Sequence, residues 1–346
     1  MHMNKYDFVQ TRKRNKTLFI VEGEREKNEL LSLICECFPE MNIKQANVLV
    51  YGTNIYQLHS RITKEYGEQW SETDVDLAFV VSKMKSLEEV WYKDNFTNIF
   101  LIFDYERQDP NFSDSIINRM QTYFIDETDN GKLYINYPMI ESYFDSFDSP
   151  DRSFKEKKVP LPFQNGKEYK KYAEGSDLAN VVTLPRRLRD ILNKKYNIKR
   201  NFMCEECVKQ MLSLSNYKTV LQDIEMILST YLEGGSIRTA ANLVYNKIMQ
   251  SAYLSQNCTY TEFMRKELSK VILRNIRKAN YIQNGNYDIS DDELKEKFYQ
   301  LNFSDILNKQ NKAGRSRENA FVWVLNTSVL IVPYYSLTLI TLDDCN

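Results

Sequence analysis

Two apolar runs that end abruptly in carboxylates constrain the fold of this chain more than any other feature. The first run, residues 18–21, is followed by Glu22, a glycine and a segment whose apolar residues have helical spacing. The second run, residues 98–103, ends in Asp104-Tyr105-Glu106. A strand, a tight turn and a helix begin a βαβ unit, so we predict parallel strands whose carboxyl ends meet at one edge of a sheet.

The N-terminal part continues this alternation of strands and helices. Strands are predicted at residues 17–22, 46–51, 98–103 and 132–137. Helices are predicted at residues 24–38, 54–66, 113–124 and 139–147, whereas residues 74–92 fit either a strand or a buried helix. The alternation predicts an α/β fold, with a mainly parallel sheet flanked by helices, over residues 1–150.

The pattern changes after residue 150. Residues 148–176 are rich in Asp, Ser, Pro, Lys and Gly, so we interpret residues 151–177 as a surface linker or loop. Residues 178–346 are predicted to form a mainly α-helical domain that binds substrate or a partner. Its helices are expected at residues 178–196, 202–213, 216–233, 236–255, 261–280 and 291–302. Residues 321–341 fit either a closing strand pair or a buried helix.

The composition indicates a globular protein and excludes several kinds of site. Hydrophobic residues make up 42% and charged residues 27% of the 346 residues, as in ordinary globular proteins. No apolar run reaches about 20 residues and no signal-peptide pattern opens the chain, which predicts a cytoplasmic protein without a membrane partner. The two histidines exclude most histidine-based metal sites and catalytic triads. The Cys204-Glu-Glu-Cys207 segment lacks a second paired knuckle, so the cysteines are expected in packed helices rather than around zinc.

The carboxylates at the two strand ends form a candidate metal site. Glu22 and Glu26, one helical turn apart, would face the same crevice, and Gly23 permits a close approach of the backbone at the turn. Asp104 and Glu106 would point to one side by the alternation of a strand. Carboxylates without histidine favour a hard cation such as Mg²⁺ or Mn²⁺. Each acidic residue could instead be a helix N-cap or a solvated loop group.

These residues resemble those of the Toprim domain, which topoisomerases, bacterial primases, ribosomal-RNA maturases and OLD nucleases share. The resemblance covers roughly residues 16–150 and implies a Rossmann-like core with a four-stranded parallel sheet. It implies that Glu22 is the glutamate of the first motif and that Glu26 is the second acidic residue of OLD-type members. Asp104 and Glu106 would stand for the DxD motif, from which Glu106 departs by one methylene. By this resemblance the four carboxylates are catalytic and bind the metal ion.

A third segment carries a further glutamate. Residues 136–144, which include Glu141, resemble a segment of RloB-like proteins, and similar segments occur in the Toprim halves of OLD-family and PARIS-type defence nucleases. The resemblance implies that Glu141 is catalytic and binds or positions a metal ion. From the residues alone, Glu141 lies in the first turn of a predicted helix, where the helix dipole favours glutamate in any case. Asp109 would add a ligand if its loop folded back.

Basic residues at helical spacing within residues 261–280 form a candidate nucleic-acid surface. They are Lys266, Lys270, Arg274, Arg277 and Lys278. The net charge of the chain is only −1, so any contact with nucleic acid must come from local patches of this kind. Such a stripe can follow a phosphate backbone, although it is more often a solvated helix face. Shorter basic clusters at residues 12–16 and 186–200 have the same two interpretations.

Together the motifs predict a metal-dependent endonuclease that hydrolyses phosphodiester bonds of tRNA or DNA. The resemblance to anti-phage Toprim proteins implies an effector of bacterial antiviral defence and abortive infection, beside an ABC- or SMC-type ATPase. The chain has no Walker A sequence, so that ATPase would be a separate subunit. A primase- or topoisomerase-like enzyme and a non-catalytic regulatory or binding subunit with a Toprim fold stay open as alternatives, as does assembly into a homo-oligomer.

Overall fold

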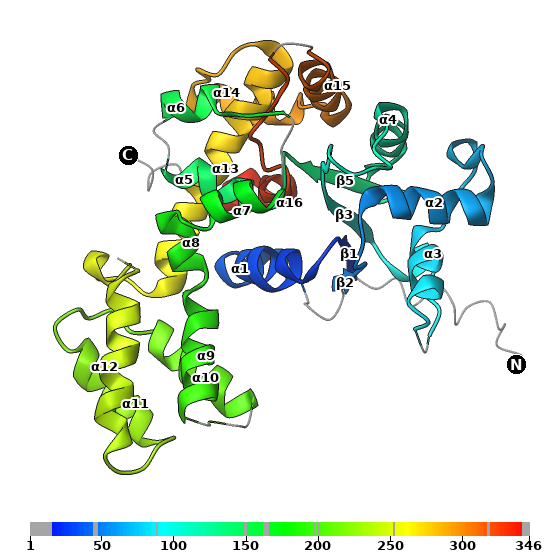
Figure 1. Ribbon diagram of the computed structural model, residues 1–346. Helices are drawn as coiled ribbons and strands as arrows, with labels where there is room; N and C mark the ends of the chain where they lie inside the picture. Colours follow the sequence, from blue (N-terminus) through cyan, green and yellow to red (C-terminus); the bar gives the residue numbers. More distant parts are fainter. Residues whose placement is uncertain are drawn as a thin grey trace, which may run out of the picture.

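A five-stranded sheet forms the centre of the protein, with the strand order β2-β1-β3-β5-β4 (Figure 1). The strands are β1 (Thr17–Val21), β2 (Val48–Val50), β3 (Asn98–Asp104), β4 (Ile125–Asp126) and β5 (Gly131–Asn136). All pairings are parallel except that of β4 with β5. The predicted α/β fold with a mainly parallel sheet is therefore confirmed, and β4 is an edge strand that the sequence did not indicate.

The computed structural model describes residues 16–43, 48–87, 89–148, 151–161, 166–196, 198, 201–251, 253–316 and 319–340. Strand β2 begins at Val48, and the start of the strand predicted at residues 46–51 lies outside these ranges.

The strand order places a topological switch point between β1 and β3. From β1 the chain moves outward to β2 and then returns across β1 to β3, with Val21 opposite Ile102. Ligands of open α/β sheets bind outside the carboxyl ends of the strands at such a point. Glu22 and Asp104 lie at this position because each of them stands at the end of one of the two strands.

Alternate side chains of the strands point to opposite faces of the sheet, and each face packs in its own hydrophobic cluster. One face buries Leu18, Ile20 and Leu101 under α2 (Ile55–Tyr66), α3 (Leu77–Met84) and α4 (Asp114–Tyr123). The other face buries Phe19 and Phe100 under the π-helix η2 (Glu26–Leu31) with α1 (Ser32–Cys37), α13 (Tyr260–Asn284) and α16 (Ile331–Tyr335). The ambiguous segment at residues 74–92 is thus mainly a buried helix, α3.

The remaining helices lie mostly in the C-terminal part of the chain. They are α5 (Ser142–Asp148), α6 (Asp151–Glu156), α7 (Gly166–Ala173), α8 (Asp177–Val182), α9 (Leu184–Tyr196), α10 (Asn201–Leu212), α11 (Val220–Ser229), α12 (Ser236–Met249), α14 (Asp291–Tyr299) and α15 (Phe303–Gly314). Short 3₁₀ turns are η3 (Pro39–Met41), η5 (Trp70–Glu72), η6 (Lys93–Asn95), η7 (Tyr253–Gln256), η8 (Ser328–Leu330) and η9 (Leu337–Leu339). None of the described helices is both long and apolar enough to cross a bilayer.

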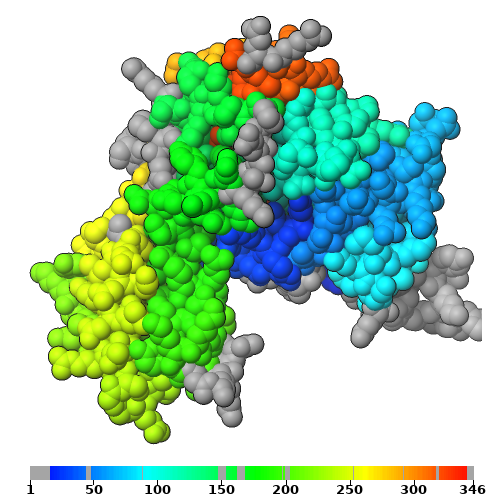
Figure 2. Space-filling view, in the orientation of Figure 1, coloured from blue at the N-terminus to red at the C-terminus, as the bar shows by residue number. Residues whose placement is uncertain are grey.

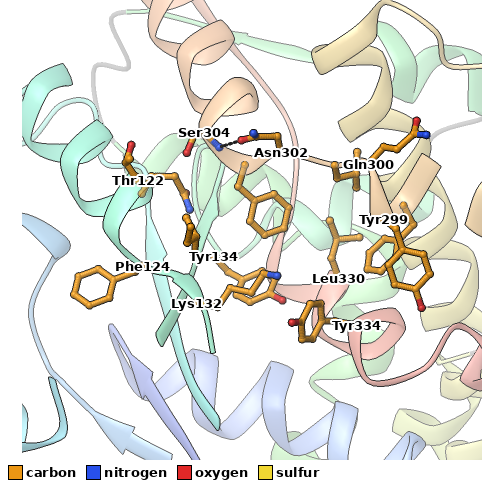
Figure 3. Close-up of a pocket in the computed structure, with 15 residues that line it drawn as sticks. Thr122, Phe124, Lys132, Tyr134, Tyr299, Gln300, Asn302, Ser304, Leu330 and Tyr334 are labelled. Atoms are coloured by element: carbon orange, nitrogen blue, oxygen red, sulfur yellow. Dashed lines mark hydrogen bonds between the residues drawn. The ribbon is translucent and has the colours of Figure 1, made fainter. Parts of the chain in front are cut away.

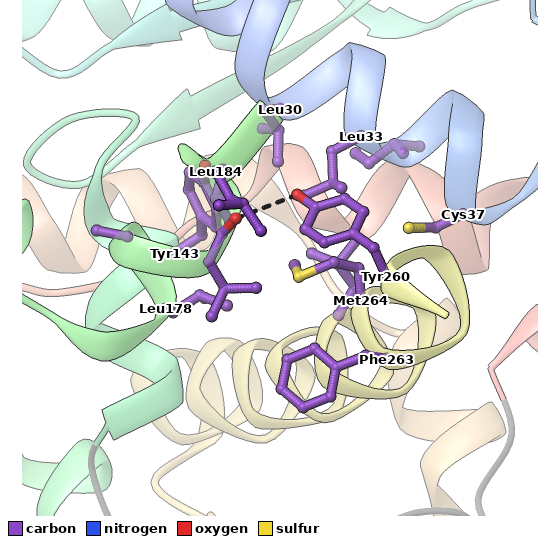
Figure 4. Close-up of a cluster of buried hydrophobic side chains, with 14 of the residues drawn as sticks. Leu30, Leu33, Cys37, Tyr143, Leu178, Leu184, Tyr260, Phe263 and Met264 are labelled. Carbon is purple, nitrogen blue, oxygen red and sulfur yellow. Dashed lines mark hydrogen bonds between the residues drawn. The ribbon is translucent and has the colours of Figure 1, made fainter. Parts of the chain in front are cut away.

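Helices α9 to α12 form a lobe that projects away from the sheet (Figures 1 and 2). A buried cluster at its base joins α8, α9 and α13 to η2 and α1, with Leu30, Leu184 and Met264 among its members (Figure 4). The Tyr260 hydroxyl donates a hydrogen bond to the carbonyl of Val181, at 3.3 Å. This packing holds η2, the helix that carries Glu26, against the helical part of the protein.

The segment expected to be a linker, residues 151–177, instead has regular structure. It contains α6, the strand β6 (Lys158–Pro160) and α7, and it buries Phe154 and Tyr169. Strand β6 pairs with β7 (Phe321–Trp323), far along the chain. The linker prediction is wrong for two reasons. The polar composition reflects only the exposed faces of these elements, and the strand that pairs with β6 lies far along the chain.

The C-terminal part does not have a core of its own. Of residues 321–341, the described part, 321–340, forms neither the strand pair nor the single helix considered above, but β7 followed by short helices. Ile306 of α15 and Val322 of β7 pack in the same cluster as one face of the sheet. The expected boundary near residue 150 therefore does not coincide with a boundary of the hydrophobic core.

Candidate metal centre

Backbone hydrogen bonds between neighbouring strands position Glu22 and Asp104. The Glu22 amide donates to the Ile102 carbonyl, at 3.1 Å, and the Glu22 carbonyl accepts from the amide of Gly52, at 2.8 Å. The Glu22 side chain turns toward β3, where its Oε2 accepts the amide of Asp104, at 3.1 Å. Oδ1 of Asp104 is buried and has no hydrogen-bond partner among the described residues. An oxygen in this state is available to a cation or a proton.

The turn after β1 holds Glu26 against the same strand ends. Glu26 opens the π-helix η2, is only 4% exposed, and accepts the amide of Gly23 through Oε2, at 2.9 Å. A Cβ at Gly23 would lie 3.2 Å from that oxygen, which explains the glycine at this position. Single π-helical turns are frequent at functional sites. The predicted proximity of Glu22 and Glu26 is thus produced by a tight turn and an unusual helix start.

Glu106 lies beyond the end of β3, so the conformation of the following loop, and not the alternation of strand residues, places it near the cluster. Strand β3 ends at Asp104, and Glu106 has a φ of 37°, in the left-handed region. The loop folds back, since the Asp109 amide donates to the Glu106 carbonyl, at 2.9 Å, and Asp109 accepts the amide group of Asn54, at 2.6 Å. Burial raises the pKa of Glu106, and a hydrogen bond from Asn54 opposes this effect. Backbone strain of this kind concentrates at functional sites.

Glu141 is held at the edge of the cluster by two cationic side chains. It precedes α5, is 3% exposed, and forms ion pairs with Arg25 and with Lys170, whose Nζ lies 3.4 Å away. Arg25 also pairs with Glu174, just after α7. Neither Arg25 nor Lys170 was among the predicted site residues. Arg25 stands within the first motif, whereas Lys170 lies in the supposed linker, where no local pattern marks it.

The five predicted carboxylates influence one another's charge. Burial raises the pKa of Asp104 well above its usual range, and four negative charges add to this effect, those of Glu22, Glu26, Glu141 and Glu106. Burial and the charge of Glu106 raise the pKa of Glu22 to about 8. Burial is also the main cause of the raised pKa of Glu26. Like charges gathered in this way favour the uptake of protons or of a cation.

The ligand atoms of the cluster are of the type that a hard cation prefers, but they are not arranged as a preformed metal site. Over the ranges that the structure describes, no three Asp, Glu, His or Cys side chains are arranged as a complete set of metal ligands. The donors at the strand ends are carboxylate oxygens, which Mg²⁺ and Mn²⁺ prefer. The described cysteines are free, buried or half-buried, and lie in or beside helices, as expected.

The basic stripe on α13 is not a solvated face. Lys278 is 0% exposed, and its Nζ donates to the carbonyls of Phe154 (2.8 Å), Lys157 (3.0 Å) and Lys155. Arg274 donates to the Ser146 carbonyl, at 2.7 Å.

Burial lowers the pKa of Lys278 to about 7. Lys270 pairs with Glu267 at 3.0 Å, while Lys266 and Arg277 are half-buried. The prediction of a continuous phosphate-binding stripe is wrong for Lys278 and Arg274, because α5 and α6 cover the basic side of α13.

We expect Lys278→Met to lower the free energy of unfolding by about 2–4 kcal/mol, because three carbonyl oxygens would lose their donor. Lys266→Met is the matched control on the same helix, with an expected change below about 0.5 kcal/mol. Urea unfolding followed by circular dichroism measures both values. Equal stability of the two variants would show that the Lys278 contacts contribute nothing.

The basic cluster on α9 lies closer to the acidic cluster. Arg186 pairs with Glu29 of η2 at 3.0 Å. Arg186, Arg189 and Arg25 line a cavity of about 510 Å³ between η2–α1 and α8–α9. Arg25 therefore connects this cavity to Glu141. The basic run at residues 12–14 and the pair at residues 199–200 lie outside the described residues.

The fold and the cluster define a doubly wound α/β protein with carboxylates at its switch point. No protein-family model, curated protein or solved structure was found to match the chain. The resemblance to the Toprim domain therefore depends on the residues and strand ends described above.

Proposed function

We propose that the protein is a Mg²⁺- or Mn²⁺-dependent nuclease of the Toprim type that hydrolyses phosphodiester bonds of tRNA or DNA. The observation that carries the proposal is the buried Asp104, whose Oδ1 has no partner among the described residues and whose pKa is raised by burial and by the negative charges of four other carboxylates. A site that collects negative charge at the switch point of a parallel sheet is suited to a cation and a phosphate.

Each residue of the cluster has a distinct part in this proposal. Glu22, Glu26, Asp104 and Glu106 would hold the metal, which when bound would activate water and stabilise the leaving oxygen. The Asp104 amide orients Glu22, and the Gly23 amide orients Glu26.

The cations beside the cluster have a supporting part. Arg25 and Lys170 hold Glu141 and place positive charge next to the carboxylates, which limits the repulsion of an approaching phosphate.

The cavity lined by Arg25, Arg186 and Arg189 would receive a polyanionic substrate if its phosphates replaced the glutamates that pair with these arginines. It adjoins the acidic cluster, so a strand that followed these guanidinium groups would pass the candidate metal site. Arginine forms paired hydrogen bonds with phosphate more readily than lysine does. We place nucleic-acid contact here rather than along α13.

The biological part of the proposal depends on the resemblance alone. By analogy with anti-phage Toprim proteins, the chain would be a defence effector in the cytoplasm that a separate ABC- or SMC-type ATPase controls. A primase- or topoisomerase-like reaction and a non-catalytic role are the alternatives that the next experiment separates.

We expect the purified protein to cut at least one of total tRNA, single-stranded DNA and plasmid with Mg²⁺ or Mn²⁺, and none with EDTA. Glu22→Gln should abolish the cutting because it removes a central carboxylate. Glu72→Gln is the matched control, since Glu72 is exposed, lies in η5 and belongs neither to the acidic cluster nor to the lining of the arginine cavity. Gel analysis of the products measures both.

Strand extension or plasmid relaxation without net cleavage would favour the primase or topoisomerase alternative. Cutting that persists in Glu22→Gln would contradict the site assignment. If isothermal titration detected no Mg²⁺ or Mn²⁺ binding either, the non-catalytic alternative would replace the proposal.

A further inference from the structure

A second cavity lies at the opposite end of the sheet from the carboxylates. It has a volume of about 650 Å³, is open to solvent on one side, and is lined by residues of α4, β4, β5 and the C-terminal helices (Figure 3). Lys132 in its wall stands opposite Phe100 on β3, whereas Asp104 stands opposite Asn136. Four residues along a strand correspond to roughly 13 Å, and Tyr134 of the same wall lies two residues, or roughly 7 Å, from the position of Asp104. None of the predicted carboxylates lines the cavity, which is therefore separate from the acidic cluster. Its volume is in the range that holds a drug-sized ligand.

Aromatic rings make up much of the wall of this cavity. Tyr134 packs edge-on against Phe303, with ring centroids 5.2 Å apart. Phe124, Tyr299 and Tyr334 bring further rings from three other elements, and Tyr299 is 62% exposed. A space bounded by rings favours a flat aromatic ligand, since stacked and edge-on ring pairs are both stabilising.

Two residues that line the cavity each bury a polar atom without a hydrogen-bond partner among the described residues. The hydroxyl of Tyr134 is one, and the Tyr134 side chain is only 1% exposed. Oε1 of Gln121 is the other, while Nε2 of the same side chain donates to the Leu133 carbonyl, at 3.1 Å. Such an unpaired group is destabilising, and a ligand with the complementary groups would recover that loss.

Lys132 does not turn the cavity into an anion site. Its ammonium lies 3.9 Å from the centroid of the Tyr334 ring. Burial lowers the pKa of Lys132, and the nearby negative charges of Glu127 and Asp126 oppose this effect. One cation that is already balanced by neighbouring carboxylates favours a neutral ligand over a phosphate.

We propose that this cavity binds a neutral, planar heteroaromatic ring that carries a hydrogen-bond acceptor and a donor on its edge, as a nucleobase does. Both protein atoms are covered, so neighbouring side chains must move aside before the Tyr134 hydroxyl donates to the acceptor and Oε1 of Gln121 accepts from the donor. The surrounding rings would stack on the faces of the base. The base comes either from a free nucleoside or from an unstacked position in a single strand. This inference does not depend on the proposed nuclease activity.

Titration of the intact protein with adenosine, guanosine, cytidine and uridine in EDTA tests the inference. We expect at least one nucleoside to bind, and Tyr134→Phe to weaken it about tenfold because one hydrogen bond is lost. The same variant should melt at an equal or higher temperature, because it removes an unpaired buried hydroxyl. Tyr253→Phe is the matched control: its hydroxyl is also buried and unpaired but lies outside this cavity, so nucleoside affinity should not change.

A six-nucleotide single-stranded RNA distinguishes the two sources of the base. Competition between this RNA and the nucleoside would identify a base of a strand as the ligand, whereas binding of the nucleoside alone would identify a small molecule; both results support the inference. Failure of all four nucleosides to bind at millimolar concentration would overturn it. So would equal nucleoside affinity of the wild type and Tyr134→Phe, or a lower melting temperature of that variant.

Discussion

Asp104→Asn is expected to abolish metal-dependent cleavage and, at the same time, to make the metal-free protein more stable. Cleavage should fall by about 10³-fold or more, because the substitution removes a charged ligand from the centre of the site. The free energy of unfolding at pH 8 in EDTA should rise by about 1–3 kcal/mol, because a neutral amide removes the penalty of burying an ionisable carboxyl and the repulsion by four neighbouring carboxylates. Opposite signs for activity and stability are characteristic of a functional cluster of like charges.

Initial cleavage rates and calorimetric melting test the two halves of this prediction separately. Asp129→Asn is the matched control, because Asp129 is exposed and lies in the turn between β4 and β5. It should change neither quantity. A variant at Asp104 that keeps full activity would remove Asp104 from the site. A variant that loses both activity and stability would indicate that the carboxylate is mainly structural.

The metal-free protein is expected to lose stability as the pH rises from 5 to 8. The pKa of Glu22 is about 8 in the folded protein, against an ordinary value of 4.5. Between these values the folded state binds more protons than the unfolded state, so the contribution of Glu22 is fully present below pH 4.5 and disappears as the pH rises through 8. The loss should amount to roughly a few kcal/mol. Mg²⁺ should restore the stability at pH 8, because the cation replaces the protons.

Urea unfolding at several pH values, with EDTA or Mg²⁺, measures this dependence. Burial lowers the pKa of His59, which adds an opposite trend below its ordinary value of 6.5. The decisive quantity is therefore the difference in the free energy of unfolding between the wild type and Glu22→Gln at each pH. The contribution of His59 is the same in both proteins and cancels in this difference. Glu22→Gln should flatten the decline, and Glu72→Gln should leave it unchanged. A Glu22→Gln curve parallel to that of the wild type would exclude a strongly raised pKa at Glu22.

The parallel direction of the central strands could be predicted because the signal is local. Apolar runs of four to six residues that end in a carboxylate mark a buried strand and its carboxyl end. Parallel pairing then brings those ends together, which is why Glu22 and Asp104 were correctly placed side by side. The backbone conformations that place Glu26 and Glu106 near these strand ends were not predictable. Neither the π-helical start at Glu26 nor the left-handed backbone of Glu106 has a local sequence pattern.

The role of α13 could not be predicted from its own residues. Its charges at helical spacing are typical of a solvated face, and the same spacing occurs when a helix crosses the centre of a protein. Whether Lys278 meets water or three carbonyl oxygens depends on where residues 154–157 lie, more than 100 positions earlier in the chain. The same reason applies to Lys170, which reaches Glu141 only because α7 packs beside α5.

The sequence by itself determined the α/β class, the parallel pairing of β1 with β3 and the gathering of carboxylates at their ends, because strand period and strand termination are local properties. Only the tertiary structure decided which charges are buried and which cations accompany the carboxylates. It also decided where the unpaired hydroxyl of Tyr134 meets a cavity. Burial is set by contacts between segments far apart in the chain, and no single segment carries that information.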